Sequence, residues 1–158
     1  MKILVCSDSH GNAENLVRAV EQEGADTLDL LVHLGDGWRD AEALHALYPR
    51  LPLEQVPGNC DLGRFEDRER IVFFGDRRVM LCHGHTLGVK SSLLRACYTA
   101  RERGAEALLF GHTHLPVIDY HDGLWLINPG SIGAYARASY CVLTVDARGF
   151  SPTMRLLP

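Results

Sequence analysis

The sequence has no long apolar run, no paired cysteines and no excess of positive charge, and each absence narrows the class of protein. The apolar stretch at residues 1–6 turns polar at Ser7, so it is too short for a signal-peptide core or a membrane span. The 5 cysteines include no C-x-x-C pair, which argues against a disulfide framework. The net charge of −4 gives no basic footprint for a nucleic-acid polymer. We therefore expect a cytoplasmic protein that binds neither a membrane nor a nucleic-acid polymer.

The length of 158 residues and the hydrophobic fraction of 46% are typical of one globular domain with its own core, here residues 1–158. In the first half, apolar runs alternate with amphipathic segments, which predicts parallel strands with helices packed on the sheet. We expect strands at 2–6, 28–34 and 53–56, and helices at 12–23 and 40–48.

The second half has a different pattern, in which short apolar runs are separated mainly by turn signals. We expect a hairpin formed by 71–74 and 78–82. A helix over 90–103 should follow, with these residues facing inward: Leu93, Leu94, Cys97 and Ala100. Further strands are predicted at 108–110, 117–120, 124–127 and 140–145, with an edge strand at 153–157. The predicted fold class is α/β, a two-sheet β-sandwich of mixed strands flanked by helices.

Five short motifs, each joining a potential metal ligand to a glycine, directly follow these apolar runs. They are Asp8-Ser9-His10-Gly11, Gly35-Asp36-Gly37, Gly58-Asn59-Cys60-Asp61, His83-Gly84-His85 and Gly111-His112-Thr113-His114. Open α/β sheets build their sites outside the carboxyl ends of the strands, where these loops would lie. Carboxylate, carboxamide and imidazole groups together suit one or two divalent cations. The sequence therefore predicts a metal centre at the ends of the strands.

The spacing within the motifs indicates how two cations could be held. Asp8 and His10 are two residues apart, so in an extended strand end they point to the same face, and His112 and His114 share this geometry. Asp36 would supply a carboxylate that can bridge two ions. Asn59 would add a neutral oxygen, and His83 a further nitrogen. Two divalent ions with two carboxylates would leave residual positive charge, which suits a phosphate oxyanion and in-line phosphoryl displacement.

In this order, the five motifs resemble those of the calcineurin-like metallophosphoesterase superfamily, from Lys2 through Ser131. The length and the third motif are similar to those of its small single-domain prokaryotic phosphodiesterases. The resemblance implies a four-layer fold, with helices outside a two-sheet sandwich. It also implies a dinuclear centre at which a metal-bridging hydroxide attacks a small phosphodiester. Mn²⁺ is the favoured ion, and Ni²⁺, Fe²⁺ and Zn²⁺ also suit mixed nitrogen and oxygen ligands.

The resemblance also assigns roles to individual residues. One ion would be held by Asp8, His10, Asp36 and His114. The second would be held by Asp36, Asn59, His83 and His112. The catalytic candidates are Asp36, Asn59, Cys60, Asp61 and His85. Residues 128–131 match a recurring family segment, which we expect to shape the site without supplying a ligand.

Cys60 departs from the family pattern, because many members carry a histidine at this position, oriented by the following acid. A thiol with an unperturbed pKa near ~8.5 cannot offer a cationic donor at pH 7, and Asp61 has no imidazole to orient. We therefore expect hydrolysis to depend steeply on leaving-group pKa, with aryl phosphodiesters favoured over alkyl ones. His85 is an alternative donor, suggested by its motif position alone.

Several alternatives stay open at this stage. A non-catalytic metal-binding scaffold on the same fold is the competing function, whereas the net charge of −4 disfavours a nuclease. His33 could support the centre or pack in the core, and Trp38 could wall a pocket or pack in the core. The guanidinium groups of Arg39, Arg64 and Arg137 could either contact a substrate phosphate or face solvent. The physiological substrate and the formation of a homo-oligomer are not decided by the sequence.

Overall fold

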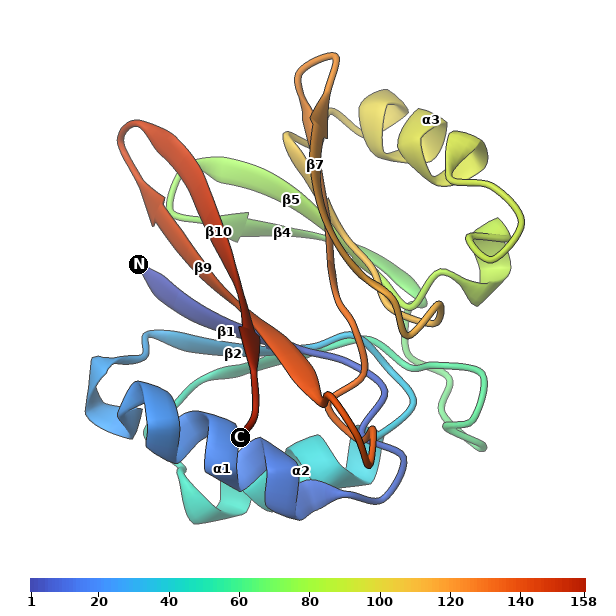
Figure 1. The fold of residues 1–158 in the computed structure, drawn as a ribbon. Coiled ribbons are helices and arrows are strands. Elements are labelled where there is room, and N and C mark those ends of the chain that lie inside the picture. Colours follow the sequence, from blue (N-terminus) through green and yellow to red (C-terminus); the bar gives the residue numbers. More distant parts are fainter.

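The computed structural model describes residues 1–158 and contains two five-stranded sheets packed face to face (Figure 1). The first sheet has the strand order β10-β9-β1-β2-β3. Its strands are β1 (Lys2–Cys6), β2 (Leu30–His33), β3 (Leu53–Gln55), β9 (Ser139–Asp146) and β10 (Gly149–Leu156). The second sheet has the order β4-β5-β6-β8-β7. Its strands are β4 (Glu69–Phe74), β5 (Arg77–Cys82), β6 (Ala107–Leu109), β7 (Pro116–His121) and β8 (Leu124–Pro129).

Helices cover the outer faces of both sheets (Figure 1). Two of them, α1 (Ala13–Glu23) and α2 (Trp38–Leu47), lie on the first sheet, and α3 (Leu94–Glu102) lies on the second. Short 3-10 turns are formed by η1 (Ala25–Thr27) and η2 (His85–Leu87). None of these helices is long and apolar enough to cross a bilayer.

The alternation of side chains along β1 explains the layering. Ile3 and Val5 point into the core between the two sheets, whereas Leu4 and Cys6 point into the core beneath α1. Because successive side chains of a strand face opposite sides, an entirely apolar strand can supply two cores at once. A third apolar cluster fills the space between the second sheet and α3. Two sheets with helices outside confirm the predicted fold class.

Both sheets are mixed, and their parallel parts set the position of the five motifs. Strands β1, β2 and β3 are parallel neighbours, as are β5, β6 and β8, and the remaining pairs are antiparallel. The strands that precede the motifs therefore end at the same edge of their own sheet. The His112 backbone N–H donates to Asp8 Oδ2 at 3.1 Å, which shows that the edges of the two sheets meet.

The third helix begins later than predicted. Residues 88–93 form turns, in which the N–H groups of Ser91 and Ser92 donate to Gly88 O at 2.9 and 3.2 Å. The Ser92 hydroxyl then accepts a bond from Leu94 N–H at 3.1 Å, and the helix starts at that residue. The prediction that Leu94 faces inward is wrong, because this first residue of the helix has an exposed fraction of 77%. The prediction is correct for Ala100, which is buried together with Ala96, and for Leu93 and Cys97, which pack against the same apolar cluster.

Smaller differences affect several other element boundaries, of which those of α2 and β10 have a clear cause. Helix α2 starts at Trp38 and not at residue 40, because the loop that contains Asp36 enters the helix directly. Strand β10 starts at Gly149 and not at residue 153, and it pairs with β9 along its whole length. The exposed face of β10 carries polar residues, so the hydrophobic pattern does not indicate the first half of this strand.

Tyr140 of β9 is fully buried and ties the first sheet to α1. Its hydroxyl donates to Glu23 Oε1 at 2.9 Å, and Glu23 also pairs with Lys2 Nζ at 3.2 Å. Burial, followed by the contact with the Glu23 carboxylate, raises the pKa of the phenol above its ordinary value. The hydroxyl is therefore a neutral donor to a carboxylate at neutral pH.

We expect Tyr140→Phe to lower the free energy of unfolding by about 1.5 kcal/mol, because the variant loses a hydrogen bond to a charged acceptor. Urea unfolding at pH 7 followed by circular dichroism measures this change. Tyr98→Phe is the matched control, since Tyr98 is exposed and its hydroxyl makes no hydrogen bond. Equal stabilities of the two variants would contradict the assignment.

Candidate metal centre

The backbone adopts a left-handed conformation at most of the predicted ligands. Positive φ values occur at Asp8 (57°), His10 (47°), Asp36 (55°), His112 (66°) and His114 (60°). Only Asp122 and Arg137 share this property among the other non-glycine residues of the chain. A non-glycine residue in this region is strained by about 1–2 kcal/mol, and such residues cluster at functional sites. The strain therefore marks the strand ends that carry the motifs.

Glycines in the motifs allow the loops to approach one another closely. A Cβ atom on Gly35 would lie 2.8 Å from His83 Nδ1 and 2.7 Å from Gly58 N. A Cβ atom on Gly58 would overlap Asp36. Any larger residue at these two positions would push the loops after β2, β3 and β5 apart, so the glycines are required by the contact between the loops.

Three groups of potential metal ligands are present, and two of them consist of predicted ligands alone. Asp8, His10 and His114 form the first of these two, with one ligand atom of each within 4.8 Å of the others. Asp8 Oδ1 is buried and accepts no hydrogen bond, although the Nε2 atoms of His114 and His10 lie 3.0 and 3.7 Å away. A buried carboxylate oxygen without a donor is destabilising. A cation among these atoms would satisfy the oxygen, so the residues present fit a metal ion.

Asp36, His83 and His112 form the second group, again with ligand atoms within 4.8 Å of one another. His83 Nε2 lies 3.4 Å from Asp36 Oδ2 and 3.2 Å from His112 Nδ1. The same Asp36 oxygen lies 3.9 Å from His10 Nε2, which belongs to the first group. Asp36 is therefore within reach of both groups.

His83 is held in one orientation by a bond on the far side of its ring. Its Nδ1 donates to Leu34 O at 2.7 Å, and the side chain is fully buried. This bond leaves Nε2 facing Asp36 and His112. A backbone carbonyl that fixes the tautomer and the ring direction is the usual support of a metal-binding histidine.

Burial and the contacts between carboxylates and imidazoles shift three pKa values in the centre. Burial lowers the pKa of His83, but the nearby carboxylates of Asp36 and Asp8 outweigh burial and raise it. Burial raises the pKa of Asp36, but hydrogen bonds from His83 and from the Cys60 N–H outweigh burial and hold it well below its ordinary range. Burial, helped by His83, lowers the pKa of His112 to about 4. Metal ligation requires an ionised carboxylate and a neutral imidazole, and the shifts of Asp36 and His112 favour these states.

Asp61 fixes the loop of Asp36 by accepting four backbone hydrogen bonds. The donors are the N–H groups of Asp36 (2.8 Å), Gly37 (3.0 Å), Trp38 (2.9 Å) and Gly58 (2.8 Å). Three of them belong to the loop and first turn of α2, and the fourth belongs to the loop after β3. The carboxylate also sits at the N-terminus of α2, where the helix dipole favours negative charge. Asp61 thus orients the backbone of the Asp36 loop. In the family pattern that the sequence resembles, the acid at this position orients an imidazole.

His33 resolves one of the alternatives left open by the sequence, because it is fully buried and connects the loops after β1 and β2. Its Nδ1 accepts from Gly35 N–H at 3.3 Å, which leaves the proton on Nε2, 3.2 Å from Ser9 Oγ. The Ser9 hydroxyl donates to Asp40 Oδ2 at 2.6 Å. Burial lowers the pKa of His33 to about 4, so the ring is neutral and can act as donor and acceptor at once.

Sequence reasoning did not single out Ser7, Ser9 or Asp40 as part of the site. The Ser7 hydroxyl donates to Asp8 Oδ2, and Asp40 accepts from both Ser9 and the Gly11 N–H, at 2.6 and 2.8 Å. The two serines flank the predicted ligand Asp8 in the sequence, and this position was the signal that could have identified them. Nothing in the sequence indicates the contact of Asp40, which lies in the next motif's helix.

The segment 128–131 contacts the site in the way expected of a loop that shapes it. The Asn128 side-chain amide donates to Gly111 O and to Thr113 Oγ1, both at 3.0 Å. The Ser131 hydroxyl donates to Asp8 O at 2.9 Å. These bonds hold the loop of His112 and His114 against the loop of Asp8.

The structure gathers six of the seven predicted ligands into the two groups and places Asn59 on an exposed loop beside them. The Asn59 amide donates to Cys60 Sγ at 3.4 Å, and this sulfur lies within 4.8 Å of ligand atoms of His10 and Asp36. His85 begins η2 outside both groups, with its ring centroid 5.4 Å from that of His83. Its Nδ1 is buried without a partner.

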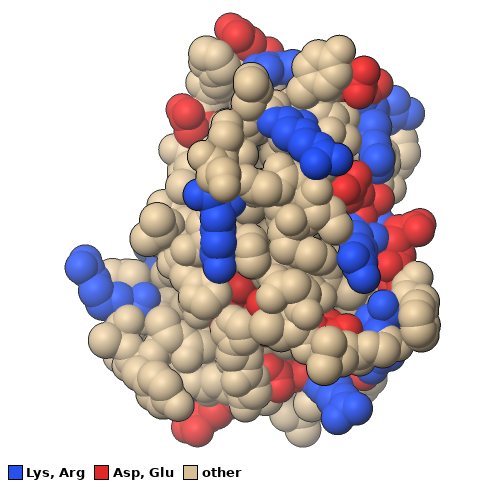
Figure 2. All heavy atoms as spheres, turned by 90° about the vertical axis from the view of Figure 1, so that its right-hand side faces the viewer, with Lys and Arg blue, Asp and Glu red and all other residues tan.

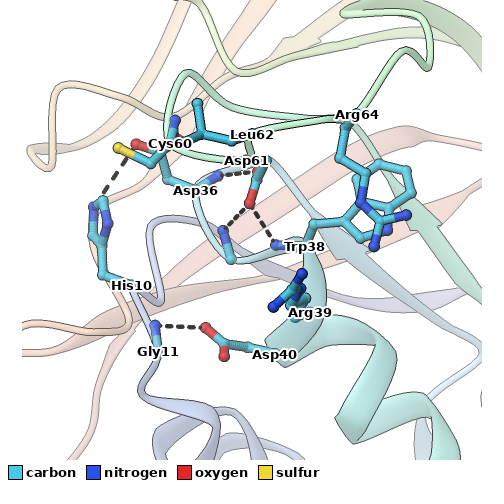
Figure 3. A pocket seen from close by; sticks show the side chains of 11 residues that line it. His10, Gly11, Asp36, Trp38, Arg39, Asp40, Cys60, Asp61, Leu62 and Arg64 are labelled. Carbon is cyan, nitrogen blue, oxygen red and sulfur yellow. Dashed lines mark hydrogen bonds and ion pairs between the residues drawn. The ribbon is translucent and has the colours of Figure 1, made fainter.

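A cavity of about 480 Å³ opens beside His10 and Asp36. It is lined by the start of α2, from Gly37 to Asp40, and by the loop that runs from Cys60 through Leu62 to Arg64. Figure 3 shows His10 and Cys60 at one side of this cavity and Trp38, Arg39 and Arg64 at the other. Trp38 is mostly buried and also lines the cavity, so both readings of this residue hold.

The fold and the grouped aspartate and histidine residues are those of the metallophosphoesterase class. Residues 1–148 match the model of the calcineurin-like phosphoesterase superfamily domain, and the chain belongs to this family. It is 38% identical to the probable metallophosphoesterase YsnB of Bacillus subtilis (strain 168), over 92% of this chain and 85% of that protein. It is 30% identical to the phosphodiesterase YfcE of Escherichia coli (strain K12), over 84% of this chain and 79% of that protein. Family membership supports a metallophosphoesterase activity, and the superfamily binds divalent metals.

Solved structures share the fold along the whole chain. A conserved Streptococcus pneumoniae TIGR4 protein, described as a predicted phosphoesterase, has a TM-score of 0.77 at 23% identity and covers 98% of this chain and 97% of that one. Vps29 of Entamoeba histolytica has a TM-score of 0.75 at 17% identity and covers 100% of both chains. At these identities the likeness concerns the fold alone.

We expect His33→Ala to weaken Mn²⁺ binding about tenfold without removing a ligand, because the variant releases Ser9 and the loop of Asp36. Isothermal titration of metal-free protein measures the affinity. His45→Ala is the control, since the His45 ring bonds only to Leu51 O at 2.9 Å on the far part of α2. An unchanged affinity in folded His33→Ala would show that His33 serves packing alone.

Proposed function

We propose that this chain is a dinuclear metal-dependent phosphodiesterase that hydrolyses small phosphodiesters. The observation that carries the proposal is the position of Asp36 between two ligand groups, each of which has one aspartate and two histidines. A carboxylate within reach of both groups is what a pair of shared ions requires. The match to phosphodiesterase YfcE supports a diester as the substrate class.

In this proposal one ion is held by Asp8, His10, Asp36 and His114, and the other by Asp36, Asn59, His83 and His112. Mn²⁺ is the favoured ion, with Ni²⁺, Fe²⁺ or Zn²⁺ as alternatives. When bound, such a pair supplies an activated water as nucleophile and positive charge for the phosphate oxygens. The chain contributes the preorganised ligands, which Asp61, His33 and Leu34 O hold in place before any ion binds.

The size and charge of the site support a small substrate. The cavity of about 480 Å³ is in the range of small-molecule sites. On the face at which β1 ends, Lys and Arg side chains are scattered among acidic and uncharged ones and form no continuous stripe (Figure 2). A polymer of nucleotides would require such a stripe along its backbone.

Neither of the two proton donors suggested by the sequence, Cys60 and His85, is cationic at neutral pH. Burial and the neighbouring Asp36 raise the pKa of the Cys60 thiol, so it is a neutral and weak acid at pH 7. Burial, followed by the charge of His83, lowers the pKa of His85, so its imidazole is neutral as well. The leaving group must then depart with little protonation, which limits the enzyme to diesters with good leaving groups.

We expect wild-type protein to bind two Mn²⁺ per chain and to hydrolyse bis-p-nitrophenyl phosphate, and Asp36→Ala to lose at least one ion and about 10³-fold or more in kcat/KM. Metal analysis after gel filtration and release of p-nitrophenolate measure the two effects. Asp76→Ala, in the exposed turn between β4 and β5, is the control. Two bound ions without turnover of any phosphoester would favour the competing function, a non-catalytic metal-binding scaffold.

We expect the rate of wild-type protein to fall steeply as the pKa of a substituted phenol leaving group rises, and the slope to become shallower in Cys60→His. A histidine could protonate the leaving oxygen, which contributes about 10²-fold or more for poor leaving groups. Cys60→Ser, a neutral hydroxyl at the same position, should keep the steep slope. Rates of wild-type protein that are independent of the leaving group, with chemistry rate-limiting, would disprove the role given to Cys60.

A further inference from the structure

The cavity beside the metal ligands contains one cation without an internal partner. Arg39, the second residue of α2, lines the cavity, is exposed and makes no side-chain hydrogen bond or ion pair. The other arginine of the cavity is engaged, because Arg64 pairs with Glu42 at 3.2 Å and stacks over the Trp38 ring at 4.9 Å. The guanidinium of Arg39 is thus the free positive charge of the cavity.

The acidic residues that share the cavity with Arg39 are already used by the protein. Asp61 accepts the four backbone bonds described above, and Asp40 Oδ2 accepts from Ser9 and Gly11. Asp36 Oδ1 accepts from the Cys60 N–H at 2.7 Å, and its Oδ2 faces the ligand groups. The first N–H groups of α2 are occupied by Asp61 as well, so an anion in this cavity would find Arg39 as its partner.

We propose that Arg39 recognises a second anionic group, a carboxylate or a phosphate, on the substituent of the phosphodiester that remains in the cavity while the scissile phosphate lies at the metal ligands. This inference rests on the proposed function and narrows its substrate class to phosphodiesters with an additional negative charge. The geometry points to it because His10 and Asp36 line one side of the cavity and Arg39 the other (Figure 3). A planar guanidinium binds both kinds of anion through two parallel hydrogen bonds.

The test compares p-nitrophenyl alkyl phosphodiesters whose alkyl chain ends in a carboxylate, a methylphosphonate or a neutral carboxamide, over several chain lengths. For Mn²⁺-loaded wild-type protein we expect kcat/KM to be about tenfold higher for the better anionic ester than for the carboxamide, mainly through KM. Arg39→Ala should reduce this ratio to about one, and Arg39→Glu should reverse it. The relative values of the carboxylate and the phosphonate identify which anion the site prefers.

Arg95→Ala is the matched control, because Arg95 is also exposed, without a side-chain partner and near the start of a helix, α3, far from the cavity. An Arg39→Ala variant that keeps the tenfold preference would overturn the proposal, and so would a wild-type protein without any preference. Loss of the preference in Arg95→Ala would show that overall charge, and not Arg39, is responsible.

Binding keeps this inference separate from the proposed function. Non-cleavable methylphosphonate monoester analogues that end in a carboxylate or a carboxamide are titrated calorimetrically into Mn²⁺-loaded wild-type and Arg39→Ala proteins. Tighter binding of the carboxylate to wild type alone supports the role of Arg39, even if no ester is hydrolysed. Equal affinity of the two analogues, or no binding of either, overturns it. Absence of bis-p-nitrophenyl phosphate hydrolysis, by contrast, counts only against the proposed function.

Discussion

The capture of four backbone N–H groups by the Asp61 carboxylate is the interaction on which the arrangement of the site depends. It joins the loop after β2 to the loop after β3 and starts α2, so Asp36 and Gly58 can lie in contact. Each such bond to a charged acceptor stabilises the fold by about 1.5–3 kcal/mol. This stabilisation offsets the strain of the left-handed backbone at Asp36. The position of Asp36 relative to both ligand groups follows from it.

The fold could be predicted from the sequence because its main signals are local. Apolar runs of strand length, such as Leu4 between Ile3 and Val5, show that a strand is buried on both faces, and Gly24 marks the end of α1. The start of α3 could not be predicted in the same way. There the turns at Gly88 and the hydroxyl of Ser92 decide where the helix begins, and the apolar pattern alone does not mark this point.

The candidate ligands could be chosen from the sequence because each follows a strand and stands beside a glycine. The structure adds what the sequence conceals, the residues that hold those ligands in place. Asp61 bonds to Trp38 from 23 residues away, and Ser9 bonds to Asp40 from 31 residues away. No periodicity connects such pairs, since their contacts depend on how the loops of different strands fold over the sheet edge. Likewise, Arg39 can be identified as the unpaired cation of the cavity only after the hydrogen-bond partners of the other polar groups there are known.

Both ligand groups contain residues that are distant in the chain, and this affects how the site can form during synthesis. The Asp8 carboxylate and the His112 N–H are separated by 104 residues, and His114 belongs to the same group as Asp8. During synthesis the first sheet's β1, β2 and β3 leave the ribosome long before β6. The nascent chain therefore exposes Asp8, His10 and Asp36 as an incomplete set, and the centre can close only after His114 has emerged.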